Sequence, residues 1–593
     1  MIFINLNSKK TMNSDMKRPK TKTIRRLLKL ILPHMKRVIL ACVCVILVNV
    51  AQLIKPYILK LVIDDFLTKH LIEKGLYSIT TMGVLYFVVV ALSGLFSITQ
   101  VMLINKVGQD IMKTLRSKVF KTIQLLPLWY VDKTTSGRLI TRATNDVEAL
   151  SEMYTDVLIN LFKDVFLIIG IIYTMIIINV SLALISFCVV PLMFGLVFIL
   201  KTKIKRIFSE MKSLIGKING FMVENISGMK TIQIFHGEKE KKEEFLELNN
   251  EYFKISLFQV WMNSFLRPAA DVFQSLAVAI LIWYGMSKIS NKTLSIGVLY
   301  AFTTYIKQFF SPISDMADNY TTIQSALVSA DRIFELVDQE EYLEDLDLGI
   351  GINHFEGNIE FKNVWFSYNN KDWILKDISF TLNKGQTAAF VGETGSGKTT
   401  IINLISGFYK IQKGEILIDG ININDIKKRD LRRNIAVVLQ DVFLFSGTIE
   451  KNVALNDNIE KTVIENALEI SHAKEIIDNF RKGINELVME RGSTLSSGQR
   501  QLLSFARAVA HEPSIFVLDE ATASIDTQTE ILIQKAVDNI TKEKTTIIIA
   551  HRLSTIRNAD IIIVLKKGKI LEMGNHDVLM DIGGYYKDLI VKG

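Results

Sequence analysis

The stretch "VGETGSGKTTIINLISG" (residues 391–407) follows an apolar, strand-like segment and precedes a helix-like one. Glycines at this spacing let backbone N–H groups turn inward around a phosphate, and the start of the following helix adds positive potential. The lysine suits the β- and γ-phosphate oxygens of ATP, and the next hydroxyl suits Mg²⁺. The stretch predicts a nucleotide-binding loop in an α/β domain, made of Gly392, Glu393, Thr394, Gly395, Ser396, Gly397, Lys398, Thr399 and Thr400.

The composition shows that this domain is only part of the protein. Hydrophobic residues make up 49% of the 593 residues and charged ones 22%, so apolar and charged segments must be separated along the chain. The net charge of +9 lies mostly beside hydrophobic stretches, where Lys and Arg hold loops in the cytoplasm rather than bind nucleic acid. Cys42, Cys44 and Cys188 fall inside apolar runs and are expected to be membrane packing residues.

The first half contains enough apolar sequence for six membrane-spanning helices, each of about 20 residues. The charge-free run from residue 165 to 200 is too long for one span, and "INVSLA" (residues 178–183) predicts a tight turn inside it. We expect the six spans at residues 38–63, from about 76 to 106, in two parts of 165–200, at 258–286 and at 294–313.

The loops set the orientation of these spans. Residues 106–156 and 201–254 are long, helix-like and rich in Lys and Arg, which predicts a cytoplasmic location with both chain ends inside. These segments are expected to form helical arms that extend beyond the bilayer. Pro, aromatic residues and Gly interrupt one arm at residues 126–146, which predicts a short docking helix against soluble protein. Residues 23–35 have an apolar face opposite basic residues and are expected to form a helix on the inner membrane surface.

Three ionisable residues interrupt the predicted spans. Arg267 and Asp271 lie four residues apart on one helical face, and Lys307 lies in the sixth span. Such groups usually face a bundle interior or an aqueous cavity. Two interpretations stay open: a cavity lining, or an internal ion pair with a lysine that extends to the interface.

A second motif in the soluble half supports the nucleotide site. "SIFVLDE" (residues 514–520) is an apolar strand that ends in two carboxylates. Asp519 is placed to hold Mg²⁺ through water, and Glu520 to polarise the attacking water. The alternative, a strand followed by surface acids, is less consistent with a phosphate loop upstream.

"TLSSGQRQLLSFARA" (residues 494–508) resembles the signature of ATP-binding cassette proteins, whose consensus is LSGGQ. The resemblance implies that Ser496, Ser497, Gly498 and Gln499 bind a nucleotide on a second cassette, with a signature serine and glycine as donors to its γ-phosphate. It also implies an adenine-stacking role for Tyr368, contacts of Gln440 with Mg²⁺ and the membrane domain, a dimer-crossing loop at Asp526, and a γ-phosphate contact for His551. The catalytic set is then Glu520, His551, Gln440 and Lys398, and the metal set Thr399, Gln440 and Asp519.

Six spans ahead of one cassette resemble the bacterial half-size multidrug and lipid exporters. The implied fold class is a membrane all-α six-helix exporter domain followed by an α/β P-loop NTPase domain. We expect an N-terminal cytoplasmic segment at residues 1–37, a transmembrane domain at 38–338, a linker at 339–356 and a nucleotide-binding domain at 357–593. The chain is expected in the cytoplasmic membrane, with its ATPase domain inside.

The resemblance implies ATP-driven export of amphipathic small molecules by a dimer, with ATP and Mg²⁺ as cofactors and no nucleic acid partner. Two departures concern the dimer: Ser497 replaces the first glycine of the signature, and Met489 stands where related exporters often have glycine. The serine resembles the variants of heterodimeric exporters, so we favour the catalytically complete half of a heterodimer. The alternatives are a homodimeric lipid or peptide exporter and an ATP-gated membrane protein that does not pump.

Overall fold

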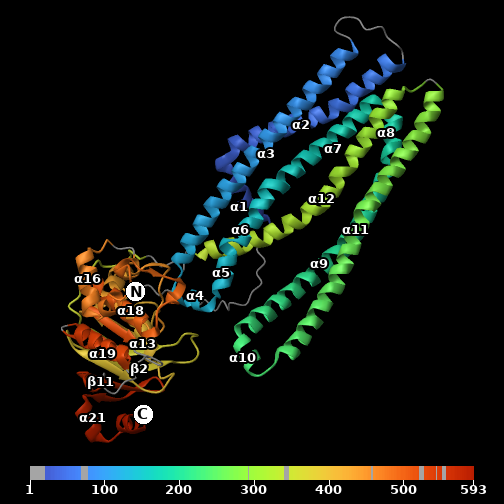
Figure 1. Cartoon of the computed structure of the whole chain (residues 1–593). Coiled ribbons are helices and arrows are strands. Elements are labelled where there is room, and N and C mark those ends of the chain that lie inside the picture. The colour runs from blue at the N-terminus through green and yellow to red at the C-terminus, as the bar shows by residue number, and fades with distance from the viewer. Residues whose placement is uncertain are drawn as a thin grey trace, which may run out of the picture. The chain divides into compact units, whose positions relative to one another are not determined.

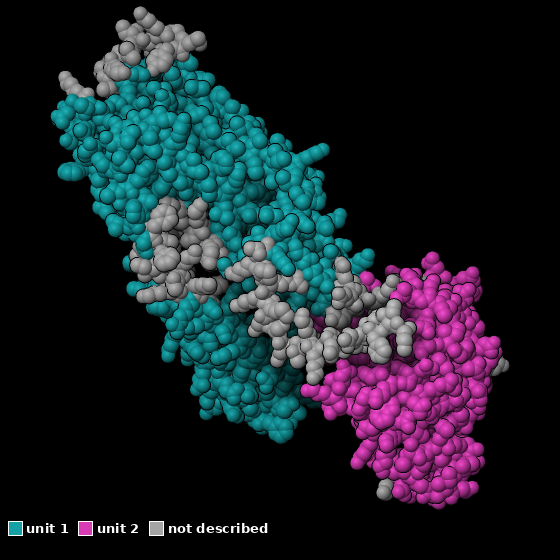
Figure 2. Space-filling model, turned by 180° about the vertical axis from the view of Figure 1, so that it is seen from behind, with its two compact units in different colours: residues 1–123, 137–339 teal, residues 124–136, 340–593 magenta. Residues whose placement is uncertain are grey.

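The structure is a computed structural model that divides into two compact units, coloured separately in Figure 2. Unit 1 comprises Met1–Ile123 and Gly137–Gln339, and unit 2 comprises Gln124–Ser136 and Glu340–Gly593. The residues that the structure describes are 20–68, 78–291, 293–339, 346–455, 458–519, 527–542, 544–549 and 556–592. Glu520, Asp526 and His551 lie outside these residues, as does the side chain of Arg267.

Unit 1 is helical (Figure 1). Several of its helices are far longer than a membrane is thick, as expected for spans that continue into arms. Its α-helices are α1 (Lys20–Ile31), α2 (Met35–Leu61), α3 (Ile79–Gln124), α5 (Ser136–Ala143), α6 (Asn145–Glu152), α7 (Leu158–Ile178), α8 (Val180–Phe187), α9 (Val190–Ser227), α10 (Met229–Ile234), α11 (Glu238–Ser290) and α12 (Ile296–Val337).

Four stretches of the described residues are long and apolar enough to cross a membrane. They are Lys22–Phe66, Ile79–Gln124, Ser136–Ile178 and Asp271–Ser290. The predicted fourth and sixth spans fall on α8–α9 and α12, whose side chains are described only in part. The predicted turn is confirmed: α7 ends at Ile178, and the Asn179 side chain accepts a hydrogen bond from the backbone N–H of Leu182 (3.0 Å) to begin α8.

Helix α12 lies in the apolar interior of unit 1. Phe302 and Tyr305 are fully buried against residues of α7 and α8 such as Ile171 and Leu182. The Tyr305 hydroxyl, which burial would otherwise leave without a partner, donates to the backbone carbonyl of Leu53 on α2 (2.7 Å). Packing on three neighbours therefore fixes the position of α12.

Polar contacts hold both ends of α12. At its start, the buried carboxylate of Asp64 accepts hydrogen bonds from the Gly297 backbone N–H (2.7 Å) and the Ser295 hydroxyl (2.6 Å). The carboxylate thereby satisfies donors that the first helical turn leaves open and complements the helix dipole.

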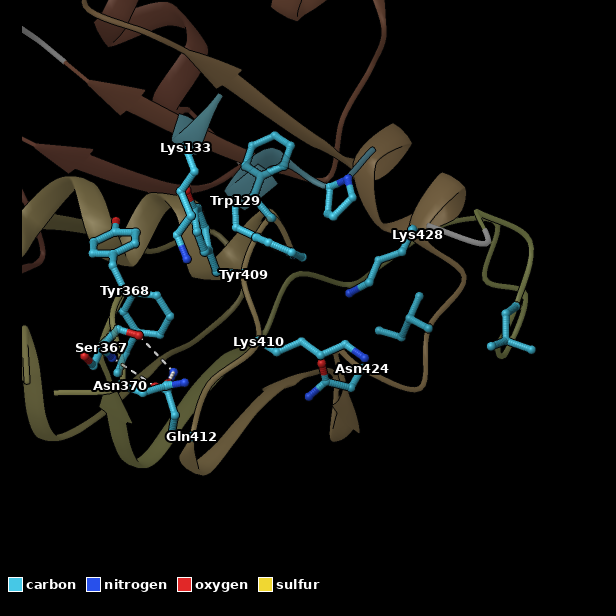
Figure 3. Close-up of a pocket in the computed structure, with 16 residues that line it drawn as sticks. Trp129, Lys133, Ser367, Tyr368, Asn370, Tyr409, Lys410, Gln412, Asn424 and Lys428 are labelled. Carbon is cyan, nitrogen blue, oxygen red and sulfur yellow. Dashed lines mark hydrogen bonds between the residues drawn. The ribbon is translucent and has the colours of Figure 1, made fainter. Parts of the chain in front are cut away.

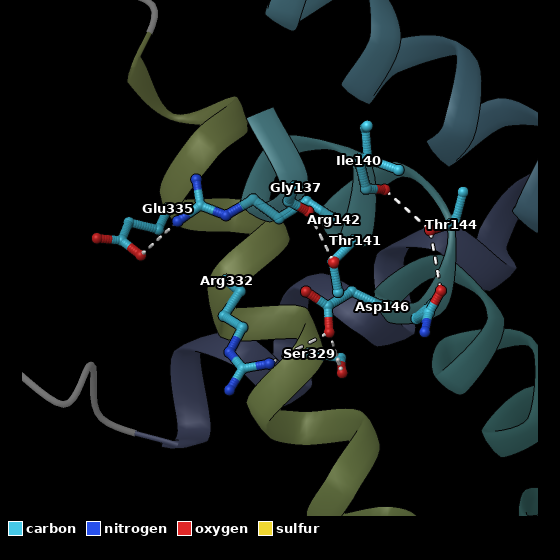
Figure 4. Close-up of polar contacts among 10 residues, drawn as sticks. Gly137, Ile140, Thr141, Arg142, Thr144, Asp146, Ser329, Arg332 and Glu335 are labelled. Atoms are coloured by element: carbon cyan, nitrogen blue, oxygen red, sulfur yellow. Dashed lines mark hydrogen bonds and ion pairs between the residues drawn. The ribbon is translucent and has the colours of Figure 1, made fainter. Parts of the chain in front are cut away.

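The far end of α12 contacts α5 and α6 through a polar cluster (Figure 4). The buried Asp146 carboxylate accepts a hydrogen bond from the Ser329 hydroxyl (2.7 Å) and lies 3.5 Å from the Arg332 guanidinium. One turn further, Arg142 lies 3.6 Å from Glu335. Helix α1 adds a bidentate ion pair from Arg26 to Asp338.

Unit 2 contains two larger sheets and a two-stranded one. The six-stranded sheet has the order β12-β11-β3-β10-β9-β6, and the four-stranded sheet the order β2-β1-β4-β5. The strands are β1 (Ile359–Phe366), β2 (Leu375–Leu382), β3 (Thr387–Val391), β4 (Lys413–Ile418), β5 (Ile421–Asn422), β6 (Ile435–Val438), β7 (Gly447–Thr448), β8 (Leu487–Val488), β9 (Ile515–Asp519), β10 (Thr545–Ile549), β11 (Ile561–Lys566) and β12 (Lys569–Gly574).

Strands β3, β9, β10 and β11 of the six-stranded sheet are buried on both faces, which explains why they read as continuous apolar runs. Ala389 and Leu518 belong to one apolar cluster, together with residues of α18 (Ser497–Ala510) and α19 (Thr527–Thr541). Their neighbours in the sequence, Phe390 and Val517, point to the opposite face. They belong to the second apolar cluster, which includes residues of α13 (Lys398–Ile405) and of the four-stranded sheet.

The remaining helices of unit 2 are short. They are α4 (Leu128–Lys133), α14 (Lys428–Asn434), α15 (Ile449–Ala454), α16 (Lys461–Ile470), α17 (Lys474–Ile477), α21 (His576–Ile582) and α22 (Tyr585–Lys592). Helix α4 lies inside the segment where a docking helix was expected, and this segment groups with the α/β unit rather than with the helices of unit 1 before and after it. The prediction of a docking helix against soluble protein is therefore confirmed.

We expect Asp146→Ala to destabilise unit 1, because the substitution leaves the buried Ser329 hydroxyl without its acceptor. The expected cost is about 1–3 kcal/mol, as for other buried polar groups that lose a partner. Arg206→Gln is the matched control, since it breaks an exposed i,i+4 pair with Glu210 (3.2 Å) that contributes about 0.3–0.5 kcal/mol. Thermal unfolding in detergent measures both variants, and equal unfolding temperatures would contradict the prediction.

Candidate nucleotide site

The sheet topology brings the predicted nucleotide-binding motifs together at the carboxyl ends of the parallel strands. Strands β3, β10, β9 and β6 pair in parallel, so their carboxyl ends meet at the same edge of the sheet. The phosphate loop follows β3, Asp519 ends β9, and Gln440 follows β6 by two residues. In sequence, Glu520 directly follows β9 and His551 lies two residues after β10.

The loop between β3 and α13 has the backbone that its glycines allow. Gly397, directly before α13, has φ of +109°, and a Cβ there would lie 2.6 Å from the Leu375 side chain. Gly392 has φ of +156°, and a Cβ there would lie 2.2 Å from the carbonyl oxygen of Leu565. Both positions therefore exclude side chains, and the loop can wrap closely around a phosphate.

Lys398 is the first residue of α13 and is buried. Its ammonium donates hydrogen bonds to the carbonyls of Gly392 (2.7 Å) and Glu393 (3.1 Å). Burial lowers the pKa of Lys398, while the negative charge of Asp519 acts in the opposite direction. The lysine is therefore held across the loop, close enough to Asp519 for the two charges to interact.

The other loop residues fit a nucleotide with its metal ion. Among the described residues, the buried Ser396 hydroxyl has no hydrogen-bond partner, so it has capacity for a phosphate or water. Thr399 and Gln440 are exposed, whereas Asp519 is 9% exposed. Two neutral oxygen donors and one carboxylate suit Mg²⁺, which prefers oxygen ligands and keeps several of its waters.

Tyr368 forms a partly exposed platform beside the loop. Its ring is 40% exposed, and its hydroxyl donates to Thr400 Oγ1 (3.2 Å) in α13. Phe366 meets the ring edge-on, with centroids 4.8 Å apart. An exposed aromatic ring of this kind suits stacking on a base.

The signature residues lie at the start of α18. The Ser496 side chain accepts a hydrogen bond from the Gln499 backbone, and the Gln499 side chain accepts one from the Ser496 backbone, which forms a capping box. Ser496 and Ser497 are exposed, whereas Gly498 is buried. Backbone and hydroxyl donors are thus presented at the N-terminus of a 14-residue helix.

Two contacts of the site were not predicted from the sequence. The Tyr585 hydroxyl donates to the Glu393 carboxylate (2.5 Å), and this bond raises the pKa of Tyr585. The Tyr409 hydroxyl donates to Asp132 of α4. Neither pair has a signal in the sequence, because the partners are 192 and 277 residues apart.

The comparisons with known proteins agree with this geometry. The family described as the ABC transporter transmembrane region matches residues 38–313, and the family described as ABC transporter matches residues 375–523. The putative ABC transporter ATP-binding protein exp8 of Streptococcus pneumoniae is 38% identical over 530 residues, which cover 89% of this chain and 91% of that protein. The chain belongs to the ABC transporter family.

Further relatives identify the kind of ABC transporter. The probable multidrug resistance ABC transporter YheH of Bacillus subtilis is 41% identical, over 85% of this chain and 75% of that protein. An ATP-dependent lipid A-core flippase of Syntrophus aciditrophicus is 32% identical, over 95% of this chain and 93% of that protein. This ABC transporter also matches the structure of a bacterial Atm1-family ABC exporter with ATP bound, with a TM-score of 0.78, 26% identity, and coverage of 94% of this chain and 98% of that one.

The family confirms the predicted fold class, a helical membrane domain followed by an α/β nucleotide-binding domain. It also confirms that this ABC transporter is an ATP hydrolase of the exporter type, located in the cell membrane. The roles of individual site residues stay predictions.

Gly397→Ala is expected to abolish ATP binding, because a left-handed φ and a clash with Leu375 would both distort the loop. Gly385→Ala is the control: its φ is +75°, but a Cβ there meets no atom within 4 Å. The control should lose about 1–2 kcal/mol of stability from backbone strain alone and keep its ATP affinity. Calorimetric titration with ATP tests the pair, and normal affinity in Gly397→Ala would refute the expectation.

Proposed function

We propose that this chain exports amphipathic small molecules, drugs or lipids, from the cytoplasm by alternating access, as one half of a dimer that is preferably a heterodimer. The observation that carries the proposal is the buried Lys398, held across a phosphate loop beside Asp519, in a chain whose other unit is built of membrane-length helices. A nucleotide site and a membrane domain in one chain suit transport powered by ATP.

The roles of the site residues follow from their positions. Lys398 would neutralise the β- and γ-phosphates, and Tyr368 would stack on adenine. Asp519, Thr399 and Gln440 would hold Mg²⁺, which supplies charge compensation for the phosphates. Glu520 would orient and deprotonate the attacking water.

His551 and Asp526 also belong to the proposed site, and Gln440 has a second role there. His551 would contact the γ-phosphate, Gln440 would report its presence to the membrane domain, and the loop of Asp526 would cross to the partner. These roles rest on the family motif, since His551 and Asp526 lie outside the described residues.

A dimer is needed to complete such a site, and exporters of this type function as dimers. The exposed serines at the start of α18 suit a nucleotide held by another chain, because donors at a helix N-terminus attract anions. The arm of unit 1 near α10 exposes large apolar side chains: Val223, Ile226, Ile234 and Phe235 are each at least 60% exposed. An apolar patch of this kind suits burial against another subunit.

The preference for a heterodimer rests on two substitutions. Ser497 adds a side chain at the first glycine of the signature, so the nucleotide that faces it meets a hydroxyl. Met489 is 57% exposed in the segment before Glu490. An altered signature beside a complete Asp519–Glu520 pair suits a chain that supplies one strong catalytic site to an asymmetric dimer.

Cargo and orientation are proposed on separate grounds. One relative is named for multidrug resistance and another for a lipid flippase, and both drugs and lipids are amphipathic. Asp271 and Lys307 are exposed in unit 1, which favours a polar cavity over an internal ion pair. We propose that both termini and the ATPase domain lie in the cytoplasm, as the Lys- and Arg-rich arms predict.

Two other functions use the same scaffold. A homodimeric lipid or peptide exporter would tolerate Ser497 in both sites. An ATP-gated protein that does not pump would have no need of a complete catalytic set, so Lys398, Asp519 and Glu520 together favour the pump.

Glu520→Gln is expected to keep ATP binding and lower turnover by at least about 100-fold, the lower range for loss of a general base. The reason is that the amide cannot accept the proton of the attacking water. Glu465→Gln, on the exposed face of α16, is the control and should hydrolyse ATP normally. Phosphate release in vesicles measures both, and undiminished hydrolysis in Glu520→Gln would rule out the assigned role.

Transport into inverted vesicles, with and without the product of a neighbouring exporter gene, tests partner and cargo together. A fluorescent amphipathic dye should accumulate only when both chains and ATP are present, and Lys398→Ala should abolish the uptake. Full ATPase activity and a stable two-fold dimer of this chain alone would replace the heterodimer with the homodimer.

A further inference from the structure

The docking segment, residues 124–136, leaves a cavity where it meets the α/β fold. The cavity has a volume of about 610 Å³ and lies between Trp129 and Lys133 of this segment and Tyr368 and Tyr409 of the fold (Figure 3). Contacts at the margin of the cavity join the docking segment to the fold.

One of these margin contacts joins Tyr409 to Asp132. The Tyr409 hydroxyl donates to the Asp132 carboxylate. Burial, followed by this carboxylate, raises the pKa of Tyr409, so the hydroxyl stays a protonated donor throughout the physiological pH range. The bond is therefore charge-assisted and persistent.

The Tyr409 ring also orients Tyr368. The two rings meet nearly perpendicular, at 88° and with centroids 5.0 Å apart, and Phe366 meets Tyr409 at 72° and 5.7 Å. Edge-to-face pairs of this kind are favourable and restrict both rings. Since the Tyr368 hydroxyl bonds to Thr400, contacts run from Asp132 through Tyr409 and Tyr368 to the helix that begins with Lys398.

We propose that Tyr409 is a positioning residue that couples the orientation of Tyr368 to the position of the docking segment, through Asp132. The inference rests on the proposed function, in which Tyr368 stacks on adenine. A base stacked on Tyr368 restricts the orientation of that ring. The perpendicular Tyr409 ring is then restricted as well, and its hydroxyl stays in position to donate to Asp132. By linkage, the docking segment stabilises the base-binding orientation to the same extent.

Three variants of the full-length chain, in nanodiscs with its partner subunit, separate the two contacts of Tyr409. Tyr409→Leu removes ring and hydroxyl, and Tyr409→Phe removes the hydroxyl alone. Tyr586→Phe is the matched control, because its hydroxyl bonds to His576 Nδ1 (2.8 Å) instead of to the docking segment. The measurements are KM and kcat for MgATP and the inhibition constant of magnesium tripolyphosphate, which has the phosphates but no base.

Tyr409→Leu should raise KM for ATP about fivefold or more, because base stacking weakens when its platform is no longer held. The inhibition constant of tripolyphosphate should stay within about twofold, since the phosphate loop is untouched. A parallel loss of tripolyphosphate affinity would overturn the inference by showing general damage to the site.

Tyr409→Phe keeps the ring, so KM should change less than about twofold while kcat falls about fivefold or more, a typical coupling between sites. Asp132→Ala should give the same result, and the double variant should be no slower than either single one. Unchanged kcat in both single variants, or additive losses, would overturn the proposal.

A further pair of variants separates this inference from the proposed function. If Tyr368→Ala leaves KM for ATP unchanged, the coupling through Tyr409 is wrong although ATP-driven export stands. If export persists in Lys398→Ala, the proposed function itself fails.

Discussion

The parallel pairing of β3, β10, β9 and β6 is the constraint on which the nucleotide site depends. In this parallel arrangement the carboxyl ends of the four strands lie side by side. Residues that follow these strands are therefore brought together, although they are far apart in the sequence. Burial on both faces makes this register hard to shift. A slip of one residue would move each side chain from the apolar cluster on one face to the cluster on the other face. Rigidity in the sheet then allows the loop above it to hold a strained backbone.

That loop shows how stability and function oppose each other within a few residues. Gly397 has no side chain that could pack, and the ammonium group of Lys398 is partly removed from water. Neither feature stabilises the fold. The lysine bonds to loop carbonyls that are weaker partners than phosphate oxygens. Binding of a nucleotide can therefore replace these contacts with stronger ones, which is the differential interaction a conformational change requires.

The sequence predicted the features that depend on local pattern. The phosphate loop, the turn at Asn179 and the docking helix all carry Gly, Pro or Asn signals within a few residues, and each lies in the structure where the pattern indicates. The apolar runs likewise indicate membrane-length helices.

Pairs of distant side chains could not be predicted in this way. Asp64 and Gly297 are 233 residues apart, and Asp146 and Ser329 are 183 apart. Taken alone, Asp64, Asp146 and Ser329 look like ordinary polar residues of helical segments, and Gly297 contributes only its backbone N–H. Asp64 and Asp146 receive their hydrogen-bond donors only because the fold brings α12 close to them. Their role as buried acceptors can therefore be recognised only once the fold is known.

The path of the chain connects the docking segment to the helices that contact the end of α12. The chain leaves unit 1 after Ile123, contributes the docking segment to unit 2 and returns at Gly137, and it crosses again after Gln339. The first return leads directly into α5 and α6, whose Arg142 and Asp146 contact the end of α12, and α12 leads to the last crossing. Both chain connections between the two units therefore adjoin helices that meet in one polar cluster. Breaking the buried hydrogen bond between Ser329 and Asp146 would cost free energy, which favours movement of α6 and α12 together.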